Sequence, residues 1–311
     1  MKKLCFTTFI FGSYQKYIPY YIYSIGRTYP EAYVKVFIDK SLNNKVLKCL
    51  DTIKTNGFVN FEIIPVNFQN LDYFNDYKIR GGGTKTLFRW LFDYKYFIDF
   101  DYLYYGDVDI LILPEKEPLL ELHVRKIKDF KVPFSNMVRK NDKGVILNRL
   151  SGLHFVETKQ YFEKINPIIC QILNNQVYRD EIMKDVVRDE QLLYEMNKIA
   201  FDFDESLLAS FQRPIHGIHL GFLRTIKNIQ SIKDHLNYHQ ISVSQEELIE
   251  SLKIIYKDPI FQKISKLCFL NEFYILNKYL KINNPISWKV SVLKNSINKI
   301  FKRIILKFRK V

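Results

Sequence analysis

The stretch Tyr102-Leu-Tyr-Tyr-Gly-Asp-Val-Asp-Ile-Leu-Ile-Leu113 decides how the rest of the chain is interpreted. Its aromatic and aliphatic run is typical of a buried strand, but Asp107 and Asp109 interrupt it, and an unpaired buried charge is very costly. Residues two apart in an extended segment point to the same side. Two such carboxylates at a strand end suit Mg²⁺ or Mn²⁺, which also bind phosphate oxygens. The simpler alternative is a solvated turn.

Strand-like and helix-like segments alternate before this stretch. Apolar runs predict strands, and apolar residues at helical spacing predict the helices between them. The strands are expected at residues 4–11, 33–38 and 61–66, and the helices at 17–25 and 42–55. This order predicts an α/β fold with a mostly parallel, doubly wound sheet and helices on both faces. In such sheets, ligands bind at the carboxyl ends of the strands.

Composition limits the classes of protein. The 311 residues are 47% hydrophobic and 15% aromatic, which allows a sizeable core and excludes a disordered chain. No apolar run approaches the roughly 18 residues of a membrane span. The basic start has a short apolar region broken by Thr7 and Thr8, which favours a first strand over a signal peptide. Cys5, Cys49, Cys170 and Cys268 have no metal or redox spacing, which favours free thiols in a reducing cytoplasm.

The net charge of +14 suggests a polyanionic partner, either nucleic acid or an anionic membrane surface. Against nucleic acid, the basic residues cluster in the tail among aliphatic residues, with no recognised reading motif. We therefore expect no nucleic acid partner.

The segment Tyr104-Tyr-Gly-Asp-Val-Asp-Ile-Leu-Ile112 resembles the metal-binding Asp-x-Asp segment of GT-A-fold glycosyltransferases, most closely bacterial enzymes of family 8. The resemblance implies that Asp107 and Asp109 hold Mn²⁺ or Mg²⁺, which bridges the two phosphates of a nucleotide sugar. It also implies that the loop after the first strand contacts base and ribose. That makes Thr7, Thr8 and Tyr17 donor-site candidates, with core packing as the alternative for each.

A glycine-rich segment precedes this stretch. Lys78-Ile-Arg-Gly-Gly-Gly-Thr-Lys-Thr-Leu-Phe-Arg-Trp90 is not a Walker loop, because Gly-Lys-Ser/Thr is absent. It predicts flexible backbone ahead of a helix with Lys85 and Arg89 on one face. Family members have an arginine near the donor here, which implies this role for Arg89 and secondarily for Lys85. A cation there would neutralise diphosphate charge. A solvated helix face is the alternative.

Two later segments also resemble the family. Ser151 and Gly152 stand where small residues line the sugar pocket and leave an amide free. Arg188-Asp-Glu-Gln-Leu-Leu-Tyr194 resembles the acidic helix start beneath the anomeric carbon, although the family carries Gln where Glu190 stands. Asp189 or Glu190 would take a proton from the acceptor hydroxyl in an inverting enzyme, or steady an oxocarbenium-like centre in a retaining one. Stabilisation of a helix N-terminus is the structural alternative.

The segment Arg213-Pro-Ile-His-Gly-Ile-His-Leu-Gly-Phe-Leu-Arg224 holds two histidines. Mn²⁺ accepts imidazole nitrogen beside carboxylate oxygen. Family 8 enzymes complete the metal site with a late His-x-x-Gly motif followed by Lys-Pro-Trp. The resemblance makes His216 and His219 metal candidates, with the choice between them open, and Gly221 and Arg224 donor candidates. Arg224 would replace the missing lysine as a diphosphate ligand. Two core histidines on a strand are the alternative.

The C-terminal part predicts helices. Ser244-Gln-Glu-Glu247 is a capping box that opens a helix to about Tyr256, and residues 261–281 predict another. Residues 286–311 have apolar residues at helical spacing and eight basic residues without an acidic one. Such a basic amphipathic helix favours the interface of an anionic membrane. A helix packed on the domain is the alternative.

We therefore expect a GT-A catalytic domain over 1–225, with a nucleotide-binding half at 1–113 and an acceptor half at 114–225. A helical appendage is expected over 226–285, followed by a membrane-associating tail over 286–311. The predicted activity is metal-dependent transfer of a sugar from a nucleotide sugar, with UDP as the expected nucleotide. The acceptor would be a saccharide or lipid-linked glycan in bacterial surface polysaccharide synthesis, at the inner face of the cytoplasmic membrane. The alternatives are a metal-dependent nucleotidyl or phosphoryl transferase and a non-enzymatic membrane-binding or nucleic-acid-binding protein.

Overall fold

A central sheet organises the computed structural model, which describes residues 3–66, 71–80, 82–224 and 244–294. The strand order is β3-β2-β1-β4-β9-β6, and β3, β2, β1 and β4 run parallel while β9 is antiparallel to both neighbours. The six strands are Leu4–Ile10 (β1), Tyr33–Ile38 (β2), Phe61–Pro65 (β3), Tyr102–Tyr105 (β4), Phe134–Ser135 (β6) and His154–Glu157 (β9). The predicted α/β class with a mostly parallel sheet is confirmed.

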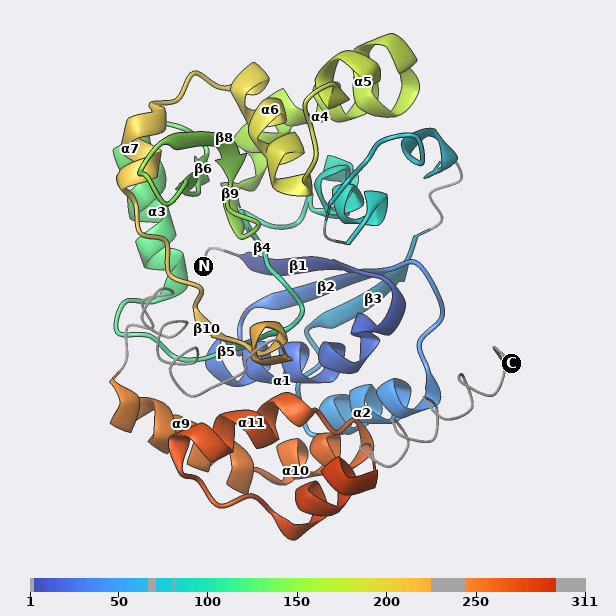
Figure 1. The fold of residues 1–311 in the computed structure, drawn as a ribbon, viewed down its shortest axis with the longest axis vertical. Helices are drawn as coiled ribbons and strands as arrows, with labels where there is room; N and C mark the ends of the chain where they lie inside the picture. Colours follow the sequence, from blue (N-terminus) through green and yellow to red (C-terminus); the bar gives the residue numbers. More distant parts are fainter. Residues whose placement is uncertain (1–2, 67–70, 81, 225–243, 295–311) are drawn as a thin grey trace, which may run out of the picture.

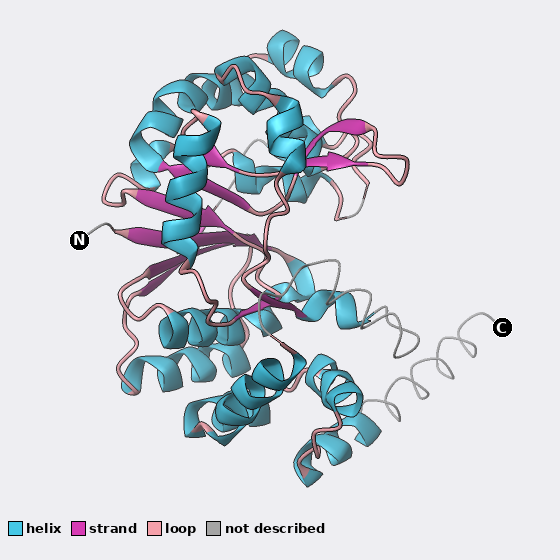
Figure 2. Ribbon diagram, turned by 90° about the vertical axis from the view of Figure 1, so that its left-hand side faces the viewer, coloured by secondary structure: helices cyan, strands magenta, loops and turns pink. Residues whose placement is uncertain are grey.

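Helices cover both faces of this sheet, as Figures 1 and 2 show from two directions. One face carries α1 (Ile18–Thr28) and α2 (Asn44–Thr55), and the other carries α4 (Thr158–Asn174), α5 (Gln176–Met183) and α6 (Asp189–Ala200). The strands alternate between two apolar cores: Phe6 and Tyr104 face the first, and Cys5 and Leu103 face the second. These two cores fix the register of β1 beside β4.

The remaining described elements lie around this framework. Two short antiparallel pairs are formed by β5 (Ile110–Ile112) with β10 (Gly217–His219) and by β7 (Val138–Lys140) with β8 (Ile146–Leu150). The other helices are α3 (Leu119–Phe130) and α7 (Glu205–Ser210), and the 3-10 turns are η1 (Gly12–Tyr17), η2 (Leu71–Phe74), η3 (Thr84–Trp90), η4 (Tyr94–Tyr96) and η5 (Leu220–Arg224).

The C-terminal helices are α9 (Gln245–Lys257), α10 (Pro259–Leu267) and α11 (Asn271–Leu280), and they lie beneath α1 and α2 (Figure 1). The predicted capping box is confirmed, since the Glu247 N–H donates to Ser244 Oγ and the Ser244 N–H donates to the Glu247 carboxylate. The single helix predicted over 261–281 is wrong. The chain breaks after α10, and both shorter helices pack aromatic side chains against the Tyr20 ring.

The tail begins differently from its prediction. Residues 286–294 are helical, and residues 295–311, like 226–243 of the predicted appendage, lie outside the described residues. Trp288 does not belong to an outward face, because its ring is buried against Tyr256, Phe261 and Phe273. Ile286, Val290 and Leu293 are exposed. Within the described part of the chain, no helix is both long and apolar enough to cross a bilayer.

Smaller predictions also change. The helix expected at 17–25 starts at Ile18 and continues to Thr28. The predicted first strand is present as β1. All four cysteines are free thiols, as expected.

Candidate active site

The sheet order reverses between β1 and β4. The chain leaves β3 at one edge and returns beside β1, so the loops after β1 and β4 separate and leave a crevice at their carboxyl ends. The Gly106 N–H donates to the Thr7 carbonyl (3.0 Å), and the next residue is Asp107. The Asp-x-Asp pair therefore begins where the two parallel strands stop pairing.

A turn places Asp109 against the late histidine segment. The Ile110 N–H donates to the Asp107 carbonyl (3.1 Å), and β5 then pairs with β10 so that Ile110 lies opposite His219. Asp109 Oδ1 lies 3.1 Å from His219 Nε2, and Asp109 Oδ2 lies 3.1 Å from Arg224 Nη2. Segments more than 100 residues apart thus meet at one carboxylate, which is 4% exposed.

The environment keeps this carboxylate ionised. Burial by itself raises the pKa of Asp109, but His219 and Arg224 outweigh it and hold the pKa below its usual value. Burial likewise lowers the pKa of His219, but the adjacent Asp109 reverses this and raises it. The pair is therefore a carboxylate beside a basic imidazole.

The two histidine candidates have separate surroundings. His216 is fully buried, with Nδ1 2.5 Å from Glu115 Oε2 and Nε2 2.8 Å from His123 Nε2. Its backbone has a positive φ of 57° immediately before β10. Burial lowers the pKa of His216, while Glu115 opposes that shift. Both ring nitrogens of His216 are thus engaged in a buried network, and His219 is the histidine that reaches Asp109.

Arg89 links the Asp-x-Asp turn to the acidic helix start. Its Nη1 lies 2.7 Å from Asp107 Oδ1, and its Nη2 lies 2.6 Å from Asp189 Oδ2. Burial lowers the pKa of Arg89, but Asp189 and Asp107 outweigh burial and raise it. The predicted shared face with Lys85 is wrong, because the segment is a 3-10 helix and residues four apart then diverge. Lys85 instead binds Asp39, with Nζ 2.6 Å from Oδ2.

Glu190 lies across from this arginine, on the first turn of α6. The Gly152 N–H donates to Glu190 Oε1 (3.0 Å), so the predicted free amide beside Ser151 is occupied by this carboxylate. Arg149 Nε lies 3.3 Å from Glu190 Oε2, and Arg139 Nη2 lies 3.6 Å from Glu190 Oε1. A side chain at position 152 would meet Arg89 Nη2 at 2.6 Å, so it would push the guanidinium away from its place between Asp107 and Asp189.

Two adjoining cavities share these side chains. The first, about 550 Å³, is lined by the end of β1, the glycine-rich segment and the β10–η5 segment, and it includes Thr8, Arg89, Asp189, Gly221 and Arg224. The second, about 840 Å³, is lined by the β7–β8 hairpin and includes Ser151 and Gly152. Both include Asp107, Arg188, Glu190, His219 and Phe222. The site therefore has two compartments that meet at the Asp-x-Asp turn.

Other candidates lie behind the cavity walls. Thr7 is buried on β1 and Tyr17 is buried below Arg224, and neither lines either of these two cavities. The Arg224 guanidinium lies 5.5 Å from the centre of the Tyr17 ring, and the Tyr17 hydroxyl donates to Glu272 of α11. Arg224 Nε lies 3.9 Å from Glu272 Oε1. The C-terminal helices therefore support the wall of the first cavity.

Several residues of this site were missed from the sequence. Tyr14 and Arg80 line the first cavity, Arg139 and Arg149 line the second, and Arg188 lines both. Tyr14 could have been found from the sequence, because it lies in the loop after the first strand, where the resemblance places contacts to the nucleotide. The arginines belong to no recognised spacing, and only the folding of the hairpin onto α6 brings them together.

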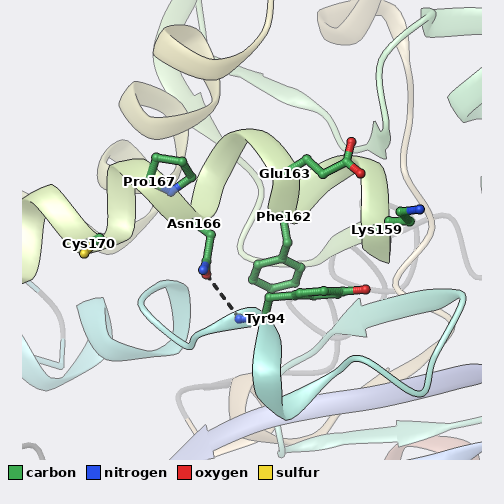
Figure 3. A pocket seen from close by; sticks show the side chains of 7 residues that line it. All are labelled: Tyr94, Lys159, Phe162, Glu163, Asn166, Pro167 and Cys170. Atoms are coloured by element: carbon green, nitrogen blue, oxygen red, sulfur yellow. Dashed lines mark hydrogen bonds between the residues drawn. The ribbon is translucent and has the colours of Figure 1, made fainter.

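A further hollow lies on the outer face of α4 and η4 (Figure 3). Tyr94 and Phe162 form its floor, and the Tyr94 N–H donates to Asn166 Oδ1 (3.1 Å). None of its lining residues lines either compartment of the site. It has no part in the arrangement described above.

Comparison with solved structures finds similar arrangements in glycosyltransferases. The galactosyltransferase LgtC, solved with donor and acceptor sugar analogs, is 18% identical over 62% of this chain and 70% of its own, with a TM-score of 0.46. GlyE of Streptococcus pneumoniae TIGR4 is 11% identical over 92% and 65%, with a TM-score of 0.44. The bifunctional WbbM is 12% identical over 89% and 52%, with a TM-score of 0.44. No family model and no curated protein sequence matches.

These similar structures are of the class that the sequence resemblance predicts.

Proposed function

We propose that this protein is a glycosyltransferase that moves a sugar from a nucleoside diphosphate sugar, with UDP as the expected nucleotide, to a saccharide or lipid-linked glycan. One observation carries the proposal. The Asp107–Asp109 turn lies where the strand order of the sheet reverses. At this turn the first compartment, which contains Arg89 and Arg224, adjoins the second compartment. The first would take the nucleotide diphosphate, because two guanidiniums bind phosphate oxygens well. The second would take the acceptor.

A divalent cation fits the donor set. Asp109 and His219 supply a carboxylate and an imidazole on one side of the turn, and Asp107 is two residues away. Within the described ranges, no three His, Cys, Asp or Glu side chains are grouped so that they could hold a metal ion by themselves, and Asp107 is bound to Arg89. The phosphate oxygens of the donor would complete the ligand set. When bound, Mn²⁺ or Mg²⁺ would offset the negative charge of the departing diphosphate.

The protein's own residues would divide the remaining work. Glu190 lines both compartments, so its carboxylate can reach the acceptor hydroxyl and the sugar that is transferred. It would either take the hydroxyl proton or steady the positive charge on the sugar, and the anomeric configuration of the product distinguishes the two. Asp189 lines only the first compartment and binds Arg89, so it would position that arginine against the diphosphate.

The first test is donor binding. Isothermal titration with UDP, GDP and CDP, with Mn²⁺ and with EDTA, should show metal-dependent binding of one nucleotide. Asp109→Asn should abolish it, and Asp51→Asn on the exposed side of α2 should leave it unchanged. Binding followed by release of UDP from a UDP-sugar, with a new glycosidic bond in the product, would establish transfer. Equal nucleotide binding by the Asp109→Asn protein in EDTA would contradict the proposal.

The alternatives predict different products. A nucleotidyl or phosphoryl transferase would leave phosphate or nucleotide on the acceptor, which mass spectrometry separates from a glycoside. A binding protein would give no turnover, and a nucleic-acid-binding protein would show steeply salt-dependent binding to DNA.

We also propose that the tail over 286–311 holds the protein on an anionic membrane surface at the cytoplasmic side. The exposed residues Ile286, Val290 and Leu293 continue the amphipathic spacing, and residues 286–311 include no Asp or Glu. Protein truncated after Asn284 should lose binding to vesicles with anionic lipid and keep nucleotide binding. Truncation also removes Trp288 from the core. A second variant, with Lys289 and Lys294 changed to Gln, therefore removes charge from the tail and keeps Trp288.

A further inference from the structure

The second compartment has an unusual charge for a saccharide pocket, and the inference drawn from it rests on the proposed function. Its lining carries five basic side chains and three carboxylates. The basic ones are Arg139, Lys140, Arg149, Arg188 and Arg213, and the carboxylates are Asp107, Asp142 and Glu190. Neutral sugars need hydrogen-bonding groups and flat apolar surfaces, whereas several guanidiniums in one cavity are typical of sites for oxyanions.

The carboxylates do not balance these cations. Asp107 is bound to Arg89, which belongs to the other compartment, at 2.7 Å. Asp142 is exposed at the turn of the β7–β8 hairpin, where water solvates it. Glu190 is the remaining carboxylate, and its single charge lies between two guanidiniums, those of Arg139 and Arg149. Both guanidiniums therefore lie beside the same carboxylate.

Arg213 adds a buried cation. It is 6% exposed, and its Nε and Nη2 have no hydrogen-bond partner among the residues that the structure describes. Its Nη1 donates to the Pro214 carbonyl (3.2 Å), and its guanidinium lies 5.2 Å from the centre of the Tyr104 ring. Burial lowers the pKa of Arg213, Tyr104 and Glu115 oppose that shift, and the nearby Arg139 adds to it. An oxyanion in this compartment would supply acceptors for Nε and Nη2 of Arg213.

We propose that the acceptor substrate carries an anionic group, a phosphate or a carboxylate, that binds in this compartment to Arg139, Arg149 and Arg213. The planar fork of a guanidinium binds two oxygens of such a group at once. An anion here would meet a lining in which basic side chains outnumber carboxylates. It would also hold the acceptor beside Glu190, with a hydroxyl turned toward the first compartment. The anion could be part of a lipid diphosphate or a substituent of the saccharide itself.

The test measures acceptor binding without turnover. Protein saturated with UDP and Mg²⁺ is titrated by ligand-detected NMR with methyl glucoside, glucose 6-phosphate, glucuronate and an alkyl diphosphate-linked glucose. The variants are Arg139→Gln and Arg149→Gln. Lys143→Gln is the matched control, because it removes the same charge from an exposed position on the same hairpin, outside the cavity lining. UDP binding by each variant shows that the fold and the first compartment are intact.

At least one anionic probe should bind about tenfold or more tightly than methyl glucoside, which is the effect of one charge-assisted hydrogen bond. Arg139→Gln and Arg149→Gln should each remove about that factor for the anionic probe alone, and Lys143→Gln should not. The preferred probe then identifies the source of the anion. Equal binding of neutral and anionic probes, or equal loss of both in the variants, would overturn the inference. Anion preference in a protein that binds no nucleotide would instead overturn the proposed function and leave this site standing.

Discussion

Gly221→Ala is the substitution for which the structure makes the sharpest prediction. A Cβ at position 221 would lie 1.8 Å from Asp109 Oδ2 and 2.6 Å from Arg224 Nη2. It would therefore stand between the two groups, whose separation is 3.1 Å. The backbone of Gly221 does not have a positive φ, so alanine is excluded by the approach of the carboxylate and not by its own conformation.

The magnitude follows from two costs. Overpacking a buried position costs about 1–3 kcal/mol, and loss of a hydrogen bond between charged groups costs about 1.5–3 kcal/mol. Because η5 can shift and Arg224 is partly exposed, we expect the free energy of unfolding to fall by about 2–4 kcal/mol. For a chain of this length the melting temperature would fall by about 3–6 °C. Displacement of Asp109 should weaken metal-dependent UDP binding by about 100-fold, as for other disturbed metal sites.

Thermal unfolding and isothermal titration with UDP and Mn²⁺ measure both effects on the same sample. Gly26→Ala is the control, because the atoms nearest to the added methyl group belong to the Phe58 ring, the closest at 2.5 Å, away from both compartments. It should change the melting temperature and leave the UDP affinity within about twofold. Wild-type UDP affinity in folded Gly221→Ala protein would refute the placement of Asp109 in the donor site.

Three further predictions concern catalysis, the metal and the C-terminal helices. Glu190→Gln should lower kcat by about 100-fold or more and leave UDP affinity nearly unchanged. Asp189→Asn should weaken UDP binding by about tenfold, because it removes a partner of Arg89. Single-turnover kinetics measure the first effect and titration the second, and variants that change kcat and UDP affinity alike would count against separate roles for the two carboxylates. Removal of metal by EDTA should lower UDP affinity by about tenfold or more, reversibly with Mn²⁺. Trp288→Ala should lower the free energy of unfolding by about 3–5 kcal/mol in urea titrations, and an unchanged value would mean that Trp288 is not part of the core.

Most of the fold could be predicted from the sequence because local patterns carry it. The alternation of apolar runs with helical spacing indicated β1, β2 and β3 and the helices between them, and the capping box at Ser244 indicated the start of α9. The failures lie where tertiary packing decides. The break between α10 and α11 lets both helices pack on α1, and no glycine or proline marks it within residues 260–280. Trp288 fits an amphipathic spacing equally well whether its ring faces a membrane or a core.

The candidate site was predictable in its acidic parts and not in its basic parts. Asp107 and Asp109 stand out in the sequence because carboxylates rarely interrupt apolar runs. Asp189 and Glu190 stand out because their segment resembles the acidic helix start of the family. Lysines and arginines occur along the whole chain, so spacing alone could not distinguish Lys85, which binds Asp39, from Arg89, which bridges two carboxylates. The form of the helix decided between them, because a 3-10 turn separates residues that an α-helix would align.

The two histidines show what a short motif can and cannot decide. The sequence made both His216 and His219 metal candidates and did not say which one reaches the carboxylates. In the structure His216 lies immediately before β10, and His219 is the last residue of that strand. The register of β10 on β5 answers this, because His219 lies opposite Ile110, directly after Asp109. His216 is then turned inward, where His123 and Glu115 engage both of its ring nitrogens, and the pairing of two short strands selects the residue that reaches the carboxylate.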